Sequence, residues 1–111
     1  MTIFVDDMHA APVGRYGRMK MSHMIGPEAE LHALAGRIGV ARRWYQGDHY
    51  DICLTKRALA VAAGAVEVTM RQLACMSRRH KVTGDFGKPE EAEAWVKVWW
   101  TAKWAEAEAV A

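Results

Sequence analysis

The feature that most constrains the fold is an alternation of short, β-branched extended runs with longer helical patterns, separated by glycines and prolines. The extended runs cover residues 2–5, 40–45 and 66–68, and a partly alternating stretch at 18–25 predicts a further strand or hairpin arm. The helical patterns cover residues 27–38, 55–63, 69–81 and 89–109. This order predicts an α/β fold with a small, partly parallel sheet of three to four strands, flanking helices and a long C-terminal helix.

The predicted helices have residues at their ends that are typical of helix termini. Pro27 suits the first turn of its helix, and Gly39 suits the end of that helix. Thr55 is predicted to cap the next helix, which Gly64 ends. Thr69 is predicted to cap the helix that follows.

The length of 111 residues fits a single modest core. We expect an α/β domain at residues 1–81, followed at 82–111 by a Trp-rich helix packed on the same domain or at an interface. The first part has 12 Lys and Arg against 7 Asp and Glu, a net charge of +5, and the second part has 3 against 6, a net charge of −3. The basic first part favours an anionic ligand, although a solvated basic face explains the same excess.

The sequence favours a cytoplasmic location without a membrane. The N-terminal residues lack the basic start of a signal peptide and soon reach Asp6 and Asp7. No apolar run approaches the roughly 20 residues that span a bilayer. Cys53 and Cys75 lie in apolar settings without a metal-ligand spacing, which is typical of reduced thiols.

The densest group of chemically active side chains lies around His49 and Asp51. Because the two residues are two positions apart, extended backbone would place both side chains on one face and Tyr50 on the other. An imidazole beside a carboxylate can serve as a general base. The alternative is that His49 and Asp51 fix a turn by hydrogen bonds, with no ligand.

Asp6 and His23 are predicted to complete this site. Asp6 follows the first predicted strand, whereas Asp7 would point to the opposite side, toward solvent or a turn cap. Ligands gather outside the carboxyl ends of parallel strands, so we expect Asp6, His49 and Asp51 to meet there and bind a divalent cation. His23 joins them if its basic loop folds over that edge.

Four cations near the site are predicted to bind a phosphate group: Arg42, Arg43, Lys56 and Arg57. The helix predicted to begin near Thr55 would add its positive end. The chain contains no Walker loop, nucleophile elbow, zinc-protease helix or dinucleotide-binding glycine pattern. The predicted site therefore rests on local chemistry and not on an established motif.

Two other polar features are interpreted as structural. The basic run at residues 78–81 ends a predicted helix, where cations complement the helix dipole. His32 lies beside an apolar helical stripe, which is typical of a histidine whose hydrogen bonds are satisfied within the fold.

The predicted C-terminal helix carries an unusually broad aromatic surface. Its tryptophans cover about half of the helix circumference: Trp95, Trp99, Trp100 and Trp104. Tryptophan is favoured at interaction hot spots, so the helix predicts a homodimer or a protein partner. Packing within the domain explains the same pattern equally well.

The first part of the chain also resembles a family of short bacterial and bacteriophage proteins classed as a domain of unknown function. The resemblance spans about residues 1–80 and rests on these segments: Val5-Asp6-Asp7-Met8, Ser22-His23, Glu30-Leu31-His32, Arg37-Ile38-Gly39, Trp44-Tyr45-Gln46, His49-Tyr50-Asp51, Lys56-Arg57 and Ala63-Gly64-Ala65. Relatives carry one acid followed by prolines where this chain has Asp6-Asp7, which makes Asp6 the matching position. The resemblance implies a phage, prophage or bacterial cytosolic setting and supplies no activity and no catalytic residues.

The sequence therefore supports two functions of different classes. The first is binding or hydrolysis of a phosphate-bearing ligand, a nucleotide or nucleic acid, at an Asp/His site with a divalent metal ion. The second is a non-enzymatic interaction module, for example a phage-encoded modulator of a host protein, that uses the C-terminal aromatic helix. Nucleic-acid binding by the basic first part is the weaker form of the first function.

Overall fold

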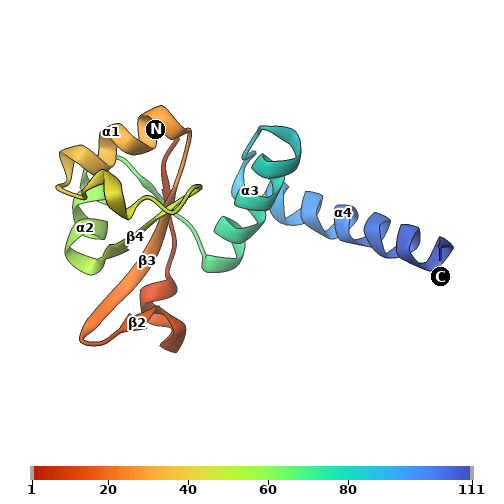
Figure 1. The fold of residues 1–111 in the computed structure, drawn as a ribbon, viewed down its shortest axis with the longest axis horizontal. Helices are drawn as coiled ribbons and strands as arrows, with labels where there is room; N and C mark the ends of the chain where they lie inside the picture. The colour runs from red at the N-terminus through yellow and green to blue at the C-terminus, as the bar shows by residue number, and fades with distance from the viewer. Residues whose placement is uncertain (1, 111) are drawn as a thin grey trace.

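The computed structural model describes residues 2–110 and has an α/β fold (Figure 1). The strands are β1 (Phe4–Val5), β2 (Arg15–Tyr16), β3 (Met19–Ile25), β4 (Tyr50–Cys53) and β5 (Val66–Glu67). The helices are α1 (Glu28–Arg37), α2 (Leu54–Ala62), α3 (Met70–Thr83) and α4 (Pro89–Ala109), with short 3-10 turns η1 (Met8–Ala10), η2 (Pro12–Gly14) and η3 (Arg42–Trp44). Helices α1 and α2 cover one face of the sheet, and α3 lies on the other side (Figure 1).

The sheet has five strands and mixed directions. The strands follow the order β2-β3-β1-β5, and β4 pairs with β3. Within residues 2–110, β1 and β5 form the parallel pair, and the pairs that involve β3 are antiparallel. The predicted α/β fold with a partly parallel sheet and a long C-terminal helix is therefore confirmed, with five strands in place of three or four.

The strand predicted at residues 40–45 is wrong. This segment contains the helical turn η3. The strand in this part of the chain is β4, and it begins later, at Tyr50. Trp44 is 58% exposed, so it does not have the buried alternate position that aromatic residues occupy in a strand. Tyr45 and Tyr50 form an isolated antiparallel bridge, and the loop between them closes on itself.

The predicted helix ends are partly correct. Thr69 caps α3, because its hydroxyl accepts from the backbone N–H of Gln72 while the Gln72 side chain accepts from Thr69 N–H. Helix α3 runs two residues beyond the predicted end and stops at Gly84, whose φ of 82° favours glycine. Thr55 does not cap α2, since that helix begins at Leu54 and Cys53 occupies the cap position without a side-chain hydrogen bond.

Side chains of alternating strand positions build two apolar clusters, one on each face of the sheet. The first lies against α1 and α2 and contains Met24, Tyr50 and Ile52 of β3 and β4. The second lies against α3 and α4 and contains Ile25, with Leu73, Met76 and Ala92 from the helices. The polar positions of β3 and β4 that face α3 are therefore free to build a site.

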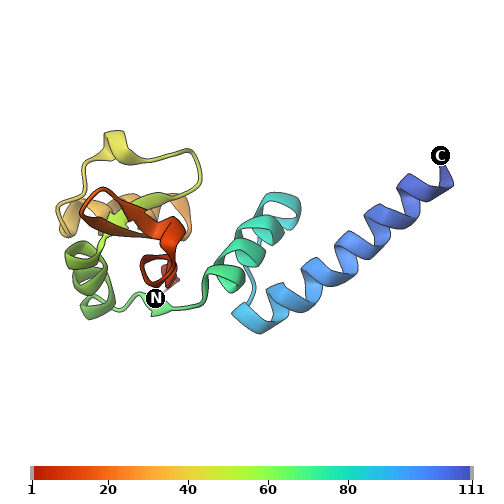
Figure 2. The same cartoon turned by 90° about the horizontal axis from the view of Figure 1, so that it is seen from below.

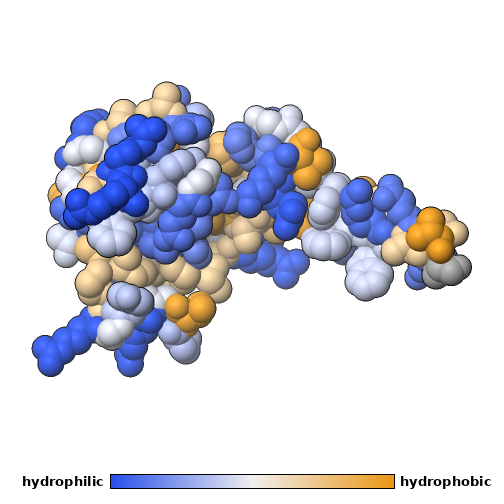
Figure 3. Space-filling model, in the orientation of Figure 1, coloured by the Kyte–Doolittle hydropathy of each residue, from blue (hydrophilic) through white to orange (hydrophobic). Residues whose placement is uncertain are grey.

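Helix α4 packs on α3 through its first half. Ala92 is buried there, whereas residues 101–110 are all exposed. The outer part of α4 extends away from the rest of the molecule (Figure 2), and hydrophobic side chains lie at the surface near its C-terminal end (Figure 3). Within residues 2–110, no helix combines the length and the apolar character needed to cross a membrane.

Candidate metal centre

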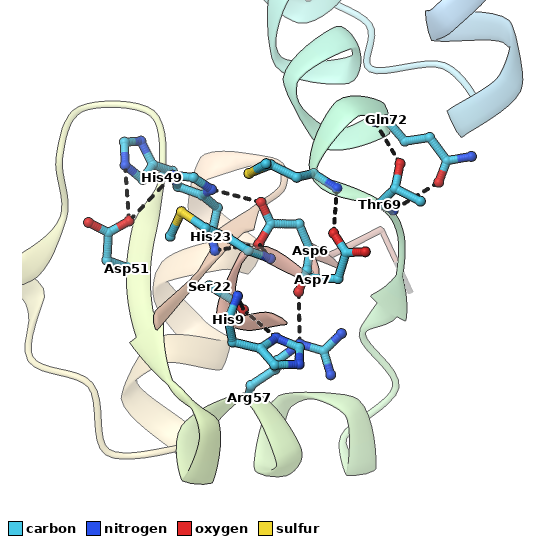
Figure 4. A network of polar contacts seen from close by, with 12 residues as sticks. Asp6, Asp7, His9, Ser22, His23, His49, Asp51, Arg57, Thr69 and Gln72 are labelled. Atoms are coloured by element: carbon cyan, nitrogen blue, oxygen red, sulfur yellow. Dashed lines mark hydrogen bonds and ion pairs between the residues drawn. The ribbon is translucent and has the colours of Figure 1, made fainter. Parts of the chain in front are cut away.

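The antiparallel ladder of β3 and β4 places His23 directly opposite Asp51. Both side chains project from the sheet face toward α3, while the neighbouring Tyr50 is buried on the other face. His49 precedes β4 and lies against His23, with the two ring centroids 5.1 Å apart. Figure 4 shows His23, His49 and Asp51 together, with Asp6 behind His23.

Asp6 is fully buried and holds His23 in place. Its Oδ1 accepts the backbone N–H groups of His23 at 2.8 Å and of Met8 at 3.2 Å, and its Oδ2 accepts from His23 Nδ1–H at 2.7 Å. Burial alone would raise the pKa of Asp6, but these hydrogen bonds lower it below its usual value. The hydrogen bond to Asp6 raises the pKa of His23, although partial burial acts in the opposite direction. In the neutral form of His23 that keeps the Nδ1 proton, Nε2 presents a lone pair to the site.

His49 is oriented in the same way by a second carboxylate. Its Nδ1–H donates to Asp48 Oδ1 at 2.5 Å, and Asp48 Oδ2 lies 2.7 Å from Lys81 Nζ of α3. Burial acts to raise the pKa of Asp48, but the contacts with Lys81 and His49 lower it below its usual value. His49 Nε2 is therefore also left with a lone pair, and it lies 3.4 Å from Asp51 Oδ1.

Asp51 Oδ1 is buried and has no hydrogen-bond partner among the described residues. Its other oxygen, Oδ2, accepts from the side-chain N–H of Gln46 at 2.7 Å. Oδ1 lies 3.4 Å from His49 Nε2 and 3.7 Å from His23 Nε2. When both histidines are neutral, their Nε2 lone pairs face the lone pairs of Oδ1, and this arrangement suits a cation between them; when they are protonated, they form ion pairs with Oδ1.

The distances also match a metal site. One ligand atom each from His23, His49 and Asp51 lies within 4.8 Å of the other two. Ligands bound tetrahedrally to zinc at about 2.0–2.2 Å are about 3.3–3.6 Å apart. Carboxylates that bind the remote nitrogen of a ligating histidine are the usual outer partners of metal sites, and Asp6 and Asp48 hold these positions.

The predicted set of ligands therefore needs one correction. Asp6, His49 and Asp51 were the predicted ligands, but both oxygens of Asp6 are engaged by His23 and Met8. His23, and not Asp6, forms a group with His49 and Asp51, and Asp6 contacts the other ring nitrogen of His23. The residues do converge, although through antiparallel pairing of β3 and β4 instead of the carboxyl ends of parallel strands.

Asp7 lies apart from this group, as predicted for a capping residue. Its Oδ1 accepts the backbone N–H of Met70, at the beginning of α3, at 2.8 Å. The predicted geometry of His49 and Asp51 on one face, with Tyr50 on the other, agrees with the structure. The alternative role for Asp51 was to fix a turn by hydrogen bonds. Its Oδ2 does so by accepting from Gln46, but its Oδ1 makes no hydrogen bond.

The four cations predicted to bind phosphate lie elsewhere. Arg57 donates from Nε to the backbone oxygen of Asp6 at 2.8 Å and pairs with Glu67, so it ties α2 to the ends of β1 and β5. Lys56 lies against Gly39, and Arg43 stacks on Trp44 within the exposed η3 segment, which also contains Arg42. None of the four lines the cleft beside His23 and His49.

Two other cations, Arg78 and Lys81 of α3, do line that cleft. The cleft has a volume of about 260 Å³ and lies between the sheet and α3. The sequence alone favours a purely structural role for both residues, at the negative end of the helix dipole. Their spacing from Ser77 and Ala74 at three to four positions places them on one helix face, and this periodicity could have identified them.

The four predicted interface tryptophans differ in exposure. Trp95 and Trp99 are half-buried and stack on each other with centroids 6.0 Å apart. Trp100 is 47% exposed and Trp104 is 67% exposed. Their role at an interface stays a prediction.

Comparison with known protein families gives a family and no activity. The model of the family "Protein of unknown function (DUF4031)" matches residues 3–80. The chain belongs to this family. No curated protein and no solved structure matches the chain.

All three candidate ligands lie within the DUF4031 domain, and so does Asp6 behind them. The match ends inside α3, at residue 80, so Lys81 and the whole of α4 lie beyond it. Two imidazoles and one carboxylate leave at least one coordination position open on a bound metal ion, as in catalytic zinc sites. The DUF4031 domain therefore contains three side chains arranged so that they could hold a metal ion, and two of them, His23 and His49, line the cleft.

Proposed function

We propose that this domain binds a first-row divalent metal ion through His23, His49 and Asp51 and hydrolyses a phosphate ester there. The observation that carries the proposal is the buried, unpartnered Asp51 Oδ1 between the Nε2 atoms of the two histidines. A structural salt bridge alone would not need both histidines oriented by separate carboxylates, Asp6 and Asp48.

The ligand types favour zinc or a similar ion. Imidazole nitrogens suit zinc, iron, nickel and copper, whereas magnesium and calcium prefer sites built of oxygen ligands. An open position on such an ion holds water, lowers its pKa and so supplies a nucleophile near neutral pH. Arg78 and Lys81 line the same cleft as His23 and His49 and would supply positive charge for a phosphate group.

The direct test is a calorimetric titration of Zn²⁺, Mn²⁺ and Mg²⁺ into the metal-free protein. We expect Zn²⁺ to bind at a ratio of one ion per chain, and Mg²⁺ to bind far more weakly. His49→Ala should lose the site while keeping its melting temperature within a few degrees, because His49 is partly exposed at the sheet edge. The matched control is His80→Gln, which removes an exposed histidine that stacks on Phe86, away from the site.

Hydrolysis is tested with bis(p-nitrophenyl) phosphate and p-nitrophenyl phosphate in the presence of the ion that binds. We expect release of p-nitrophenol by the wild-type protein and His80→Gln, but not by His49→Ala. Equal Zn²⁺ binding by all three proteins would refute the metal site. Metal binding without turnover of either ester would retain the site and refute the hydrolytic function.

A second function, self-association through α4, is supported by a separate observation. Trp100 and Trp104 are among the exposed large hydrophobic side chains, and they lie on the outer part of α4. Tryptophan contributes strongly at interaction surfaces because it buries a large apolar area. Light scattering should then give a dimer for the full chain and a monomer for a chain that ends at residue 99. A monomeric full chain contradicts this function.

A further inference from the structure

The cleft beside the three candidate ligands has an apolar wall and a cationic rim. On the side of α3, Met70, Leu73 and Ala74 line it, and Ile25 of β3 extends this apolar surface. Ser77 contributes a hydroxyl group to the same lining. A bare phosphate ion would use only the rim, so the apolar wall indicates a ligand with an attached apolar group.

Arg78 is the cation of this cleft that is free to bind an anion. Lys81 is already paired with Asp48 at 2.7 Å, whereas Arg78 makes no ion pair with any residue in the described part of the chain. The guanidinium of Arg78 lies over the ring of Trp99, 5.5 Å from its centroid. Such stacking orients the flat guanidinium and leaves its N–H edge available for two hydrogen bonds to a phosphate.

The size of the cleft limits what the apolar wall can hold. A volume of about 260 Å³ lies just below the usual range of about 300–1,000 Å³ for small-molecule sites, so the ligand is small. Met70 offers a pliable thioether side chain of the kind that packs on flat rings. The Ser77 hydroxyl offers a hydrogen bond to a polar ring edge. A flat heterocycle uses both features, whereas an alkyl chain uses only the apolar ones.

We propose that the ligand of this cleft is a nucleoside monophosphate, with its base against Met70 and Leu73 and its phosphate between Arg78 and the metal ligands. This inference rests on the proposed function, because it names the substrate class of the same centre. Residues of α3 would contact the base, and Arg78 would bind the phosphate whether or not a metal ion is present.

The test is a calorimetric titration of metal-free protein, in the presence of chelator, with AMP, inorganic phosphate and hexyl phosphate. We expect AMP to bind about tenfold more tightly than inorganic phosphate, and hexyl phosphate to bind no better than phosphate. Arg78→Ala should weaken AMP and phosphate alike, by about tenfold or more. Met70→Ala should weaken AMP alone and remove its advantage over phosphate.

Arg71→Ala is the matched control, because Arg71 is an exposed arginine of α3 that pairs with Glu93 and does not line the cleft. It should bind all three ligands like the wild-type protein. Equal affinity for AMP and phosphate, or a preference for hexyl phosphate, would overturn the proposal. Because no metal ion is present, these results are independent of the zinc titration. AMP binding without a metal site, and a metal site without AMP binding, are therefore distinguishable outcomes.

Discussion

Two groups of histidine and acid side chains lie on opposite faces of the same sheet, and they differ in whether their polar atoms are satisfied. On the α1 side, His32 Nδ1 accepts from the Tyr50 hydroxyl at 2.6 Å, and its Nε2 faces Glu28 at 3.4 Å. On the α3 side, His23 and His49 each use one ring nitrogen and leave the other facing Asp51.

The difference separates a structural histidine from a candidate ligand. His32 also packs edge-on against Tyr45, with centroids 4.5 Å apart, so its ring is held by contacts on every side. Both groups combine imidazoles with acids, and composition alone does not distinguish them. What distinguishes them is a buried acceptor atom without a hydrogen-bond donor, and among the buried side-chain oxygens of residues 2–110 this atom is Asp51 Oδ1.

The largest contrast is expected from replacing one histidine in each group. His23→Ala removes a ligand and should weaken Zn²⁺ binding by more than the roughly 10–100-fold that loss of an outer partner costs. His32→Ala should leave Zn²⁺ binding unchanged, since His32 contacts Tyr50 on the opposite face. Calorimetric titration measures both. Similar losses in the two variants would show that the groups do not differ in function.

Asp6→Asn tests the outer position behind His23. The amide keeps the shape of the side chain but cannot accept from both the backbone N–H and Nδ1–H of His23 as a carboxylate does. We expect Zn²⁺ affinity to fall by about 10–100-fold. Metal-free Asp6→Asn should also unfold at lower urea concentration, because a buried hydrogen-bond partner is lost at a cost of about 1–3 kcal/mol. An unchanged affinity would argue against an orienting role for Asp6.

Tyr50→Phe tests the group on the α1 side of the sheet, in which the hydrogen bonds of His32 are satisfied. The change removes the hydroxyl that donates to His32 and leaves the buried ring in place. We expect a loss of stability of about 1 kcal/mol and no change in Zn²⁺ affinity. Urea unfolding monitored by circular dichroism gives the first quantity, and calorimetry the second. A loss of metal binding here would mean that the two faces are coupled.

The pH dependence of metal-free stability gives the smallest effect. The pKa of Asp6 is lowered in the folded protein, so its contribution is present above about pH 4 and is lost as pH falls further. The pKa of His23 is raised, so its contribution is full below about pH 6.5 and is lost as pH rises through the folded value. Melting temperatures between pH 5.5 and 8.5 should therefore decline more steeply for the wild type than for Asp6→Asn. Parallel curves would contradict this coupling.

Local chemistry made some of this centre predictable from sequence. The two-residue spacing of His49 and Asp51 fixes their common face wherever the backbone is extended, and the choice of Asp6 over Asp7 followed from strand alternation. The convergence of His23 with His49 and Asp51 was predictable only as a condition on how its segment folds, because it depends on the antiparallel register of β3 against β4. That register is set by side chains far away in sequence.

For the cations, position in the sequence was a poor guide to position in the fold. Arg57 lies near the centre in sequence, yet it binds the backbone of Asp6 and the side chain of Glu67. Arg78 is distant in sequence and reaches the cleft because α3 packs across the sheet face. Sequence proximity therefore did not identify the two cations that line the cleft, Arg78 and Lys81. The aromatic character of residues 40–45 misled in a similar way, since β propensity without a pairing partner does not form a strand.

The register of β3 against β4 also limits where this domain can tolerate changes in chain length. A single residue inserted into β4 would turn the strand residues on one side of it to the opposite faces, and so separate the alignment of His49 and Asp51 from that of Tyr50 and Ile52, because successive strand residues face opposite sides. The exposed segment around η3 has no such requirement. Insertions and deletions compatible with the fold should therefore fall in that segment and be excluded from the four residues of β4.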